Sequence, residues 1–244
     1  MVLDKNESLK VNSLEIGNDF DLIAITQNET SNATQVTNDT IAAIGNKYPD
    51  KMLAIDTTSS MAGIFLDFSL ADIWYASVQK CFGLPAGLGI LIVSPKAIER
   101  AKAKGEKGRY NSLNFMLENA ANYQTHYTPN VLNIYLLNRV LADLPNIAKV
   151  NAKTEERMRI LEEIVEQSPA LDFLVSNEAT RSRTVLGVGG EEKFIKQIKA
   201  EAEEHGMQMG SGYGPLKPTS FRIANFPALN DDEFEQLIAF LKAY

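Results

Sequence analysis

Residue types that usually build special sites are scarce in this sequence. It contains one cysteine and two histidines among 244 residues. The single cysteine, Cys81, excludes a disulfide within the chain and fits a reducing compartment such as the cytoplasm. The histidines, His126 and His205, lie far apart in the sequence, and no metal site is predicted from them.

Long hydrophobic runs and excess positive charge are also absent. The apolar runs are too short to span a bilayer, and the first residues do not resemble a signal peptide. A net charge of −7 disfavours nucleic acid or an anionic membrane as a partner. We therefore expect a cytoplasmic protein that binds neither nucleic acid nor membranes. Its 45% hydrophobic content is ordinary for a globular chain with a substantial core.

The pattern of apolar runs predicts two kinds of lobe. Runs at 22–25, 52–55, 73–76 and 90–93 predict strands, with helices over 39–47, 95–104, 130–141 and 147–167. From about residue 170 the pattern changes to strands at 171–175, 184–187 and 221–225 and helices over 191–204 and 231–243. These patterns predict an α/β large domain with a mainly parallel sheet in residues 1–145. They also predict an α+β small domain in residues 146–244.

Lys80 is the most informative residue of the sequence. It follows the predicted strand 73–76 and precedes the glycine-rich turn 83–89. The amine is thus expected at the carboxyl end of a strand, where open α/β sheets place their ligands. Partial desolvation there would favour the neutral amine that attacks a carbonyl group. From position alone, an exposed loop lysine is the alternative interpretation.

Two other polar residues follow neighbouring strands. Asp56 ends the run at 52–55, and Thr30 follows the run at 22–25. Three successive strands would then bring Thr30, Asp56 and Lys80 to one edge of a sheet. A carboxylate can pair with a protonated ring nitrogen, a hydroxyl can donate to a phenolate oxygen, and an amine can form an imine. A pyridoxal phosphate ring requires these three contacts. Helix capping by Asp56 and turn formation by Thr30 are the alternatives.

Short motifs around these residues resemble those of the class V pyridoxal-phosphate aminotransferases. They are Asn28-Glu29-Thr30, Ala54-Ile55-Asp56, Gln79-Lys80, Gly87-Leu88-Gly89 and Tyr127-Thr128-Pro129. The similarity extends over residues 15–243 and is greatest to the phosphoserine aminotransferase branch. It implies a fold-type I transferase dependent on pyridoxal phosphate (PLP), with a partial large-domain sheet and a carboxy-terminal small domain.

The resemblance also implies a role for each matching residue around the cofactor. Lys80 would form the Schiff base with PLP, and Asp56 would hold the pyridinium nitrogen. Thr30 would bond the ring hydroxyl oxygen, and Gln79 would lie near the phosphate. Thr128 would reach the phosphate of the cofactor in a neighbouring subunit, which implies a homodimer.

Arg222 matches the family's arginine for the substrate carboxylate, because a planar guanidinium fits a carboxylate with two parallel hydrogen bonds. The implied reaction transfers an amino group between an amino acid, with phosphoserine among the candidates, and a 2-oxo acid. The phosphoserine enzymes carry a histidine-arginine pair before this arginine. Here residues 212–218 contain only Lys217 as a cation. The donor therefore stays open.

The resemblance leaves two alternatives to an aminotransferase. The chain is shorter than a typical member, and we expect it to lack the amino-terminal segment that supplies the family's phosphate loop and stacking aromatic ring. A noncatalytic fragment or pseudoenzyme acting through a partner chain is therefore one alternative. A class V lyase or desulfurase is the other. Two features disfavour a lyase or desulfurase. Gln79 stands where those enzymes have histidine, and the sequence has no downstream cysteine that could be catalytic.

Overall fold

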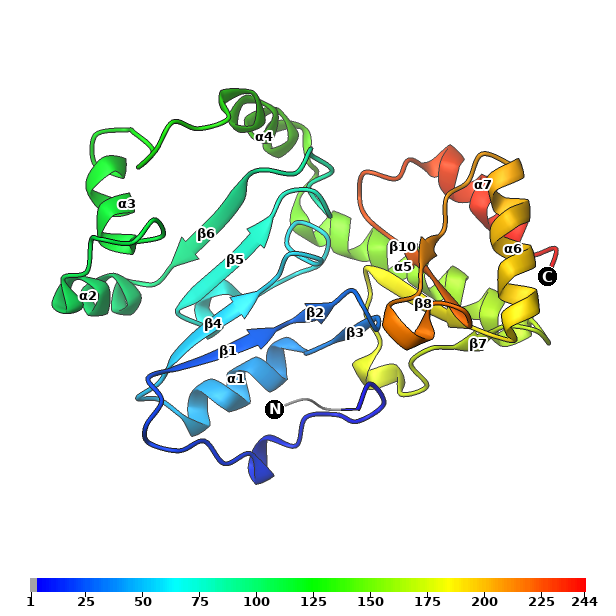
Figure 1. Cartoon of the computed structure of the whole chain (residues 1–244), viewed down its shortest axis with the longest axis horizontal. Coiled ribbons are helices and arrows are strands. Elements are labelled where there is room, and N and C mark those ends of the chain that lie inside the picture. Colours follow the sequence, from blue (N-terminus) through cyan, green and yellow to red (C-terminus); the bar gives the residue numbers. More distant parts are fainter. Residues whose placement is uncertain (1–3) are drawn as a thin grey trace.

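The computed structural model describes residues 4–244, which form two lobes side by side (Figure 1). Each lobe is built on its own four-stranded sheet. Helix α5 (Ile147–Gln167) leads from the first lobe into the second. Among residues 4–244, no helix combines the length and hydrophobicity that a membrane crossing requires.

The sheet of the first lobe contains four strands in the order β1-β4-β5-β6. They are β1 (Leu22–Thr26), β4 (Met52–Asp56), β5 (Ile73–Ser77) and β6 (Gly89–Val93). The β1/β4 and β4/β5 pairs are parallel, whereas β6 turns back antiparallel to β5. Central strand β4 is covered on both faces, which explains its unbroken apolar run. The predicted mainly parallel sheet is thereby confirmed.

Helix α1 (Asn38–Lys47) forms the crossover between β1 and β4. It begins where the Thr37 side chain accepts a hydrogen bond from the backbone N–H of Thr40. Its buried side chains Ile41 and Ile44 pack with Ile55 and Trp74 in the core of this lobe. Three helices follow β6, namely α2 (Pro95–Lys104), α3 (Leu113–Ala120) and α4 (Val131–Asp143). Of these, α3 was not predicted from the sequence.

The sheet of the second lobe is antiparallel throughout, with the order β7-β8-β10-β9. Its strands are β7 (Asp172–Phe173), β8 (Val185–Gly189), β9 (Gly210–Ser211) and β10 (Ser220–Ala224). Helices α5, α6 (Glu192–Glu204) and α7 (Asp231–Leu241) pack around the same core. The predicted strand over 171–175 is wrong in length, because only two of its residues pair in strand β7 with β8. The apolar residues around them are buried in the core instead.

A small hairpin joins the two lobes. It consists of β2 (Asn28–Glu29) and β3 (Thr34–Gln35), which pair antiparallel just after β1. Ala33 lies in the turn of this hairpin and is fully buried against Val175 and Val185 of the second lobe. The amide N–H of Ser182 donates to the carbonyl of Ala33 at 2.9 Å. The hairpin therefore carries the residue that follows β2, Thr30, to the boundary between the lobes.

The amino-terminal residues also pack on the second lobe. The hydroxyl of Thr180 donates to the carbonyl of Lys5 at 3.0 Å, and the N–H of Ser176 donates to Asn6 Oδ1 at 2.8 Å. The domain boundary between residues 145 and 146 accordingly stays a prediction. Four short 3-10 turns complete the described chain, at Val11–Ser13, Phe68–Leu70, Glu178–Thr180 and Gly214–Leu216.

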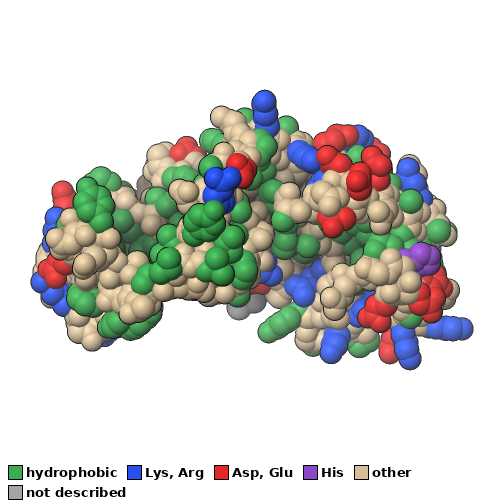
Figure 2. All heavy atoms as spheres, turned by 90° about the horizontal axis from the view of Figure 1, so that it is seen from above, with side chains coloured by type: hydrophobic (Ala, Val, Ile, Leu, Met, Phe, Trp, Pro, Cys, Tyr) green, Lys and Arg blue, Asp and Glu red, His purple; other side chains and the backbone are tan. Residues whose placement is uncertain are grey.

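Hydrophobic side chains are exposed on helix α4. Figure 2 shows them gathered over this helix, whereas acidic side chains gather over the second lobe. The exposed large hydrophobic residues of α4 are Val131, Leu132, Ile134, Tyr135 and Leu141. We call this set the α4 patch.

Candidate active site

The carboxyl ends of β1, β4 and β5 lie at one edge of the first sheet. Asp56 is the last residue of β4 and pairs in register with Thr26 of β1 and Tyr75 of β5. Lys80 follows shortly after the end of β5 at Ser77. Parallel strands present their carboxyl ends together, and open α/β sheets bind ligands there. The structure thus brings the predicted residues Asp56 and Lys80 to the same edge.

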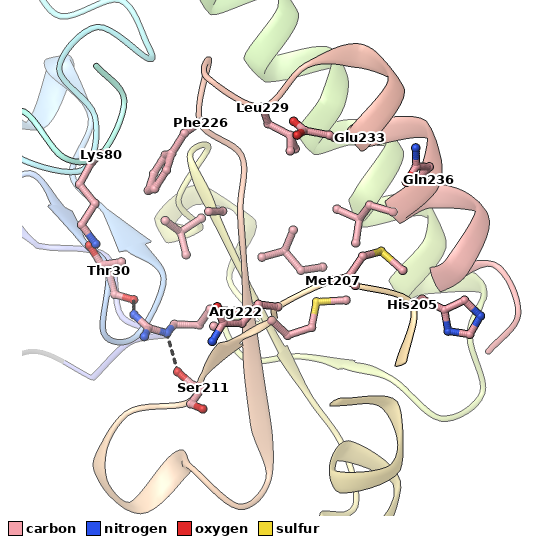
Figure 3. Close-up of a pocket in the computed structure, with 18 residues that line it drawn as sticks. Thr30, Lys80, His205, Met207, Ser211, Arg222, Phe226, Leu229, Glu233 and Gln236 are labelled. Carbon is pink, nitrogen blue, oxygen red and sulfur yellow. Dashed lines mark hydrogen bonds between the residues drawn. The ribbon is translucent and has the colours of Figure 1, made fainter. Parts of the chain in front are cut away.

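A cavity of about 800 Å³ opens between this edge and the second lobe. Lys80, Thr30 and Arg222 line one end of it (Figure 3). Lys80 is half-buried, and its Nζ atom lies 5.9 Å from the centre of the Phe226 ring. Lys80 forms a salt bridge with none of the carboxylates in residues 4–244. Its amine therefore faces the cavity without a charged partner from the described chain.

The buried residue Ser59 connects the segments that surround this end of the cavity. Its hydroxyl is hydrogen-bonded to the hydroxyl of Thr30. Its carbonyl accepts hydrogen bonds from Asn28 Nδ2 at 3.2 Å, Cys81 Sγ at 3.3 Å and Thr184 Oγ1 at 2.5 Å. One peptide group thereby ties the β2–β3 hairpin and the Lys80 turn to the beginning of β8. The positions of Thr30 and Lys80 depend on this junction.

Cys81, next to Lys80, is a structural residue. It is 2% exposed, and burial raises the pKa of its thiol well above the usual range. Gly63 packs directly on it, since a Cβ atom at Gly63 would come within 2.6 Å of Cys81 Sγ. A buried neutral thiol is a poor nucleophile. The structure thus supports the role of a small buried hydrophobic residue that the sequence suggested.

Arg222 on β10 bridges the two lobes. Its Nη1 donates to the carbonyl of Thr30 and its Nε donates to the carbonyl of Ser211, each at 2.8 Å. Within residues 4–244, Nη2 has no hydrogen-bond partner. The guanidinium is therefore held firmly at the cavity end next to Lys80, with one nitrogen still available to a ligand.

Asp56 lies at the sheet edge but does not line the cavity. Its Oδ1 accepts a hydrogen bond from the N–H of Thr58 at 2.9 Å. Burial raises the pKa of the Tyr75 hydroxyl, and the negative charge of Asp56 raises it further. Asp56 and Tyr75 are register partners on neighbouring strands, so their side chains lie on the same face of the sheet. Strand order alone does not predict that Asp56 is absent from the cavity lining.

Four other residues from the sequence analysis do not line the cavity. Gln79 and Thr128 are exposed and do not line the cavity. Lys217, considered as a cation for a substrate phosphate, is also exposed and outside the cavity. His126 packs among aromatic rings, with ring centres 5.4 Å from Tyr110 and 4.9 Å from Tyr127. The structure by itself assigns no role to these residues.

Sequence reasoning missed Ser59, Ser211 and Phe226. Ser59 belongs to a run of hydroxyl residues, Thr57 to Ser60, directly after a buried strand, and that run was the available signal. Ser211 and Phe226 reach the site from the second lobe. Their approach depends on how the lobes pack, which no local pattern encodes.

The donors at this edge fit the group that the sequence predicts. An amine without a carboxylate partner, a carboxylate with a single N–H donor on Oδ1, a hydroxyl and a guanidinium lie around contiguous strand ends. These are the groups that bind and react with an aromatic aldehyde cofactor and an amino acid. In the described chain, the side chains of His, Cys, Asp and Glu form no group of three that could hold a metal ion.

Comparisons with known proteins identify relatives along nearly the whole chain. Residues 1–225 match the family described as Aminotransferase class-V. A phosphoserine aminotransferase from Rhodococcus opacus (strain B4) is 29% identical over 225 residues, which is 89% of this chain and 59% of the relative. The chain thus spans about 60% of the length of the curated relatives it matches.

Solved structures agree in fold. The crystal structure of a phosphoserine aminotransferase from Cytophaga hutchinsonii ATCC 33406 superimposes with a TM-score of 0.90 and 33% sequence identity. The match covers 98% of this chain and 68% of that one. A PLP-bound phosphoserine aminotransferase from Trichomonas vaginalis superimposes with a TM-score of 0.74 at 16% identity, over 95% of this chain and 62% of that one.

Proposed function

Because the chain belongs to the class-V aminotransferase family and has the fold-type I architecture of its relatives, we propose that it transfers an amino group between an amino acid and a 2-oxo acid, with pyridoxal phosphate as cofactor. The observation that carries this proposal is the cavity end where Lys80, Thr30 and Arg222 converge. An amine, a hydroxyl and a guanidinium there can serve the cofactor and the substrate together.

Each residue of the proposed site has a distinct task. When bound, the cofactor supplies an electron sink that stabilises negative charge on the substrate α-carbon. Lys80 would hold the cofactor, and its amine would take up the proton that leaves the substrate α-carbon. Asp56 would favour the protonated ring nitrogen, because a carboxylate favours a nearby positive charge. Thr30, whose hydroxyl is hydrogen-bonded to that of Ser59, would donate to the ring oxygen.

Two exposed residues complete the proposal. Gln79, directly before Lys80, would contact the cofactor phosphate, and Thr128 would contact that of a neighbouring subunit. This role of Thr128 requires a homodimer. The α4 patch begins three residues after Thr128 and exposes large apolar side chains that a second copy would cover. A cytoplasmic location, which rests on the single buried cysteine, stays a prediction.

Arg222 is proposed to bind the substrate α-carboxylate. With Nε and Nη1 already bonded to the carbonyls of Ser211 and Thr30, a carboxylate would approach Nη2 first. Nη1 carries a second N–H, so a two-pronged contact through Nη1 and Nη2 can form while Nη1 keeps its hydrogen bond to the carbonyl of Thr30. The substrate carboxylate would then lie next to the hairpin that carries Thr30.

The relatives described above are aminotransferases. This similarity favours neither a lyase or desulfurase nor a noncatalytic fragment that acts through a partner chain.

A single assay tests the proposed reaction. Purified protein is incubated with PLP, an amino acid and 2-oxoglutarate, and the glutamate formed is measured by chromatography. We expect glutamate from the natural chain and none from Lys80→Ala. Equal amounts from both proteins, or none from the natural chain across amino-acid donors, would contradict the proposal.

A further inference from the structure

The cavity continues beyond Arg222 into the second lobe (Figure 3). Its lining there includes four large apolar side chains, of which Met209, Leu229 and Leu237 also pack against the core of that lobe. We call Met207, Met209, Leu229 and Leu237 the apolar wall. The uncharged residues Gln208 and Gln236 line the same part of the cavity.

Positive charge is missing from this part of the cavity. The cationic residues along the lining are Lys80 and Arg222, both at the other end, while His205 borders the apolar wall. His205 Nδ1 is 2.8 Å from the carbonyl oxygen of Glu201, and Figure 3 shows the ring pointing away from Arg222. The charged residue beside the apolar wall is Glu233, whose Oε2 accepts from the N–H of Asn230 at 3.0 Å. An anion in this space would face a carboxylate.

The geometry of an amino acid connects the two ends of the cavity. The amino group, the carboxylate and the side chain of an amino acid are all bonded to the same carbon atom. If the amino group lies next to Lys80, where the cofactor would be held, and the carboxylate binds Arg222, the side chain must occupy the space that remains. In this cavity, that space extends along the apolar wall.

We infer that the apolar wall is the side-chain subsite and that the amino donor carries an uncharged, apolar side chain. The inference rests on the proposed function, since Lys80 and Arg222 orient the donor. A phosphate group in this subsite would lose its hydration without gaining a cationic partner, which is unfavourable. Removing an unbranched aliphatic side chain from water is favourable, and methionine side chains can adapt to its shape.

Binding can be measured without turnover, on the full chain with methionine methyl groups labelled with ¹³C. The probes are L-norleucine and O-phospho-L-serine. We expect L-norleucine to shift the methyl signals of Met207 and Met209, while the buried Met158 stays in place as an internal reference. We expect its Kd to be at least about tenfold lower than that of O-phospho-L-serine, because a pocket of this type discriminates by about 10- to 200-fold.

Two variants separate the subsite from the fold. Leu237→Glu places a carboxylate in the cavity and should weaken L-norleucine binding by about tenfold or more. Ile238→Glu is the matched control, because Ile238 packs against the same core but does not line the cavity. It should leave the Kd unchanged. If Leu237→Glu does not fold, the comparison of the two probes on the natural chain decides the question.

Tighter or equal binding of O-phospho-L-serine would overturn the inference, as would unshifted Met207 and Met209 signals with L-norleucine. Covalent attachment of PLP to Lys80 is measured separately. Attachment together with a preference for O-phospho-L-serine overturns only the apolar subsite. L-Norleucine binding at Met207 and Met209 without attachment supports the subsite and contradicts the proposed function.

Discussion

Arg222 fastens the hairpin that carries Thr30, and we propose that it also binds the substrate carboxylate at the cavity end. Lysine in its place keeps a positive charge but cannot donate in two directions from a rigid plane. We expect Arg222→Lys to raise the KM for every amino-acid donor by about 10- to 100-fold, the effect of losing a charged hydrogen bond. Steady-state kinetics with several donors would measure it. An unchanged KM would remove Arg222 from the substrate site.

Cys81 offers a second test at the scale of one residue. Burial raises the pKa of its thiol, so at neutral pH the fraction present as reactive thiolate is smaller than for a free cysteine. We expect iodoacetamide to modify Cys81 far more slowly in the native protein than in urea, with mass spectrometry as the readout. Equally fast modification in both would show that the Ser59 junction around Cys81 opens readily.

Single residues were predictable where strand ends determine their position. Lys80, Asp56 and Thr30 each follow an apolar run, and the parallel order of β1, β4 and β5 brings those ends together. The link from Arg222 to the carbonyl of Thr30 was not predictable. It joins residues 192 positions apart and depends on the packing of two lobes.

At the scale of elements, helix α7 completes the cavity wall through Leu237. Its amino terminus is fixed by a capping box, in which the Asn230 side chain accepts from the N–H of Glu233 and the Glu233 side chain accepts from the N–H of Asn230. We expect Asn230→Ala to lower the free energy of unfolding by about 1 kcal/mol. Urea denaturation would measure this.

The control for the capping box is Asn138→Ala, at an exposed position within α4. Since that side chain caps no helix end, we expect its free energy of unfolding to stay within about 0.5 kcal/mol of the natural value. Equal loss in both variants would mean that the Asn230 cap contributes nothing beyond the general effect of the substitution.

Elements with strong periodicity were predicted well. The predicted bounds of α2 and α5 coincide with those of the structure, because Pro95 fixes one start and a long amphipathic pattern defines the other helix. The short pieces β2, β3, β7 and β9 are two residues each and were missed or misjudged. A strand of two residues is too short to show a hydrophobic period in the sequence, and only its pairing with another strand in the folded chain defines it.

For the whole molecule, the main prediction concerns association. The α4 patch exposes Leu132 at 63%, and a second copy that covers it would also bring Thr128 near a neighbouring site. We expect the natural chain to be a dimer by light scattering, and Leu132→Glu to shift it toward the monomer. Tyr213→Glu, at an equally exposed apolar residue of the second lobe, should stay dimeric. A monomeric natural chain would contradict the homodimer.

The general organisation of the molecule was also visible in the sequence, where helix-strand alternation gives way to an α+β pattern near residue 170. The cavity between the lobes was not visible. Its walls come from residues 30, 80, 185 and 205–211 and from parts of the segment 222–237, which share no local pattern. The hydrophobic core of each lobe has a sequence signature, whereas the space between the lobes is set by their packing.

The most direct test of the account is the chemical identity of the residue that holds the cofactor. The natural chain is incubated with PLP, reduced with borohydride, digested, and each lysine-containing peptide is examined by mass spectrometry. The account predicts a reduced pyridoxyl group on Lys80 and its loss in Lys80→Ala. Lys96→Ala, at an exposed lysine distant from the cavity, should keep the label. A label on another lysine, or one that persists in Lys80→Ala, would contradict the assignment.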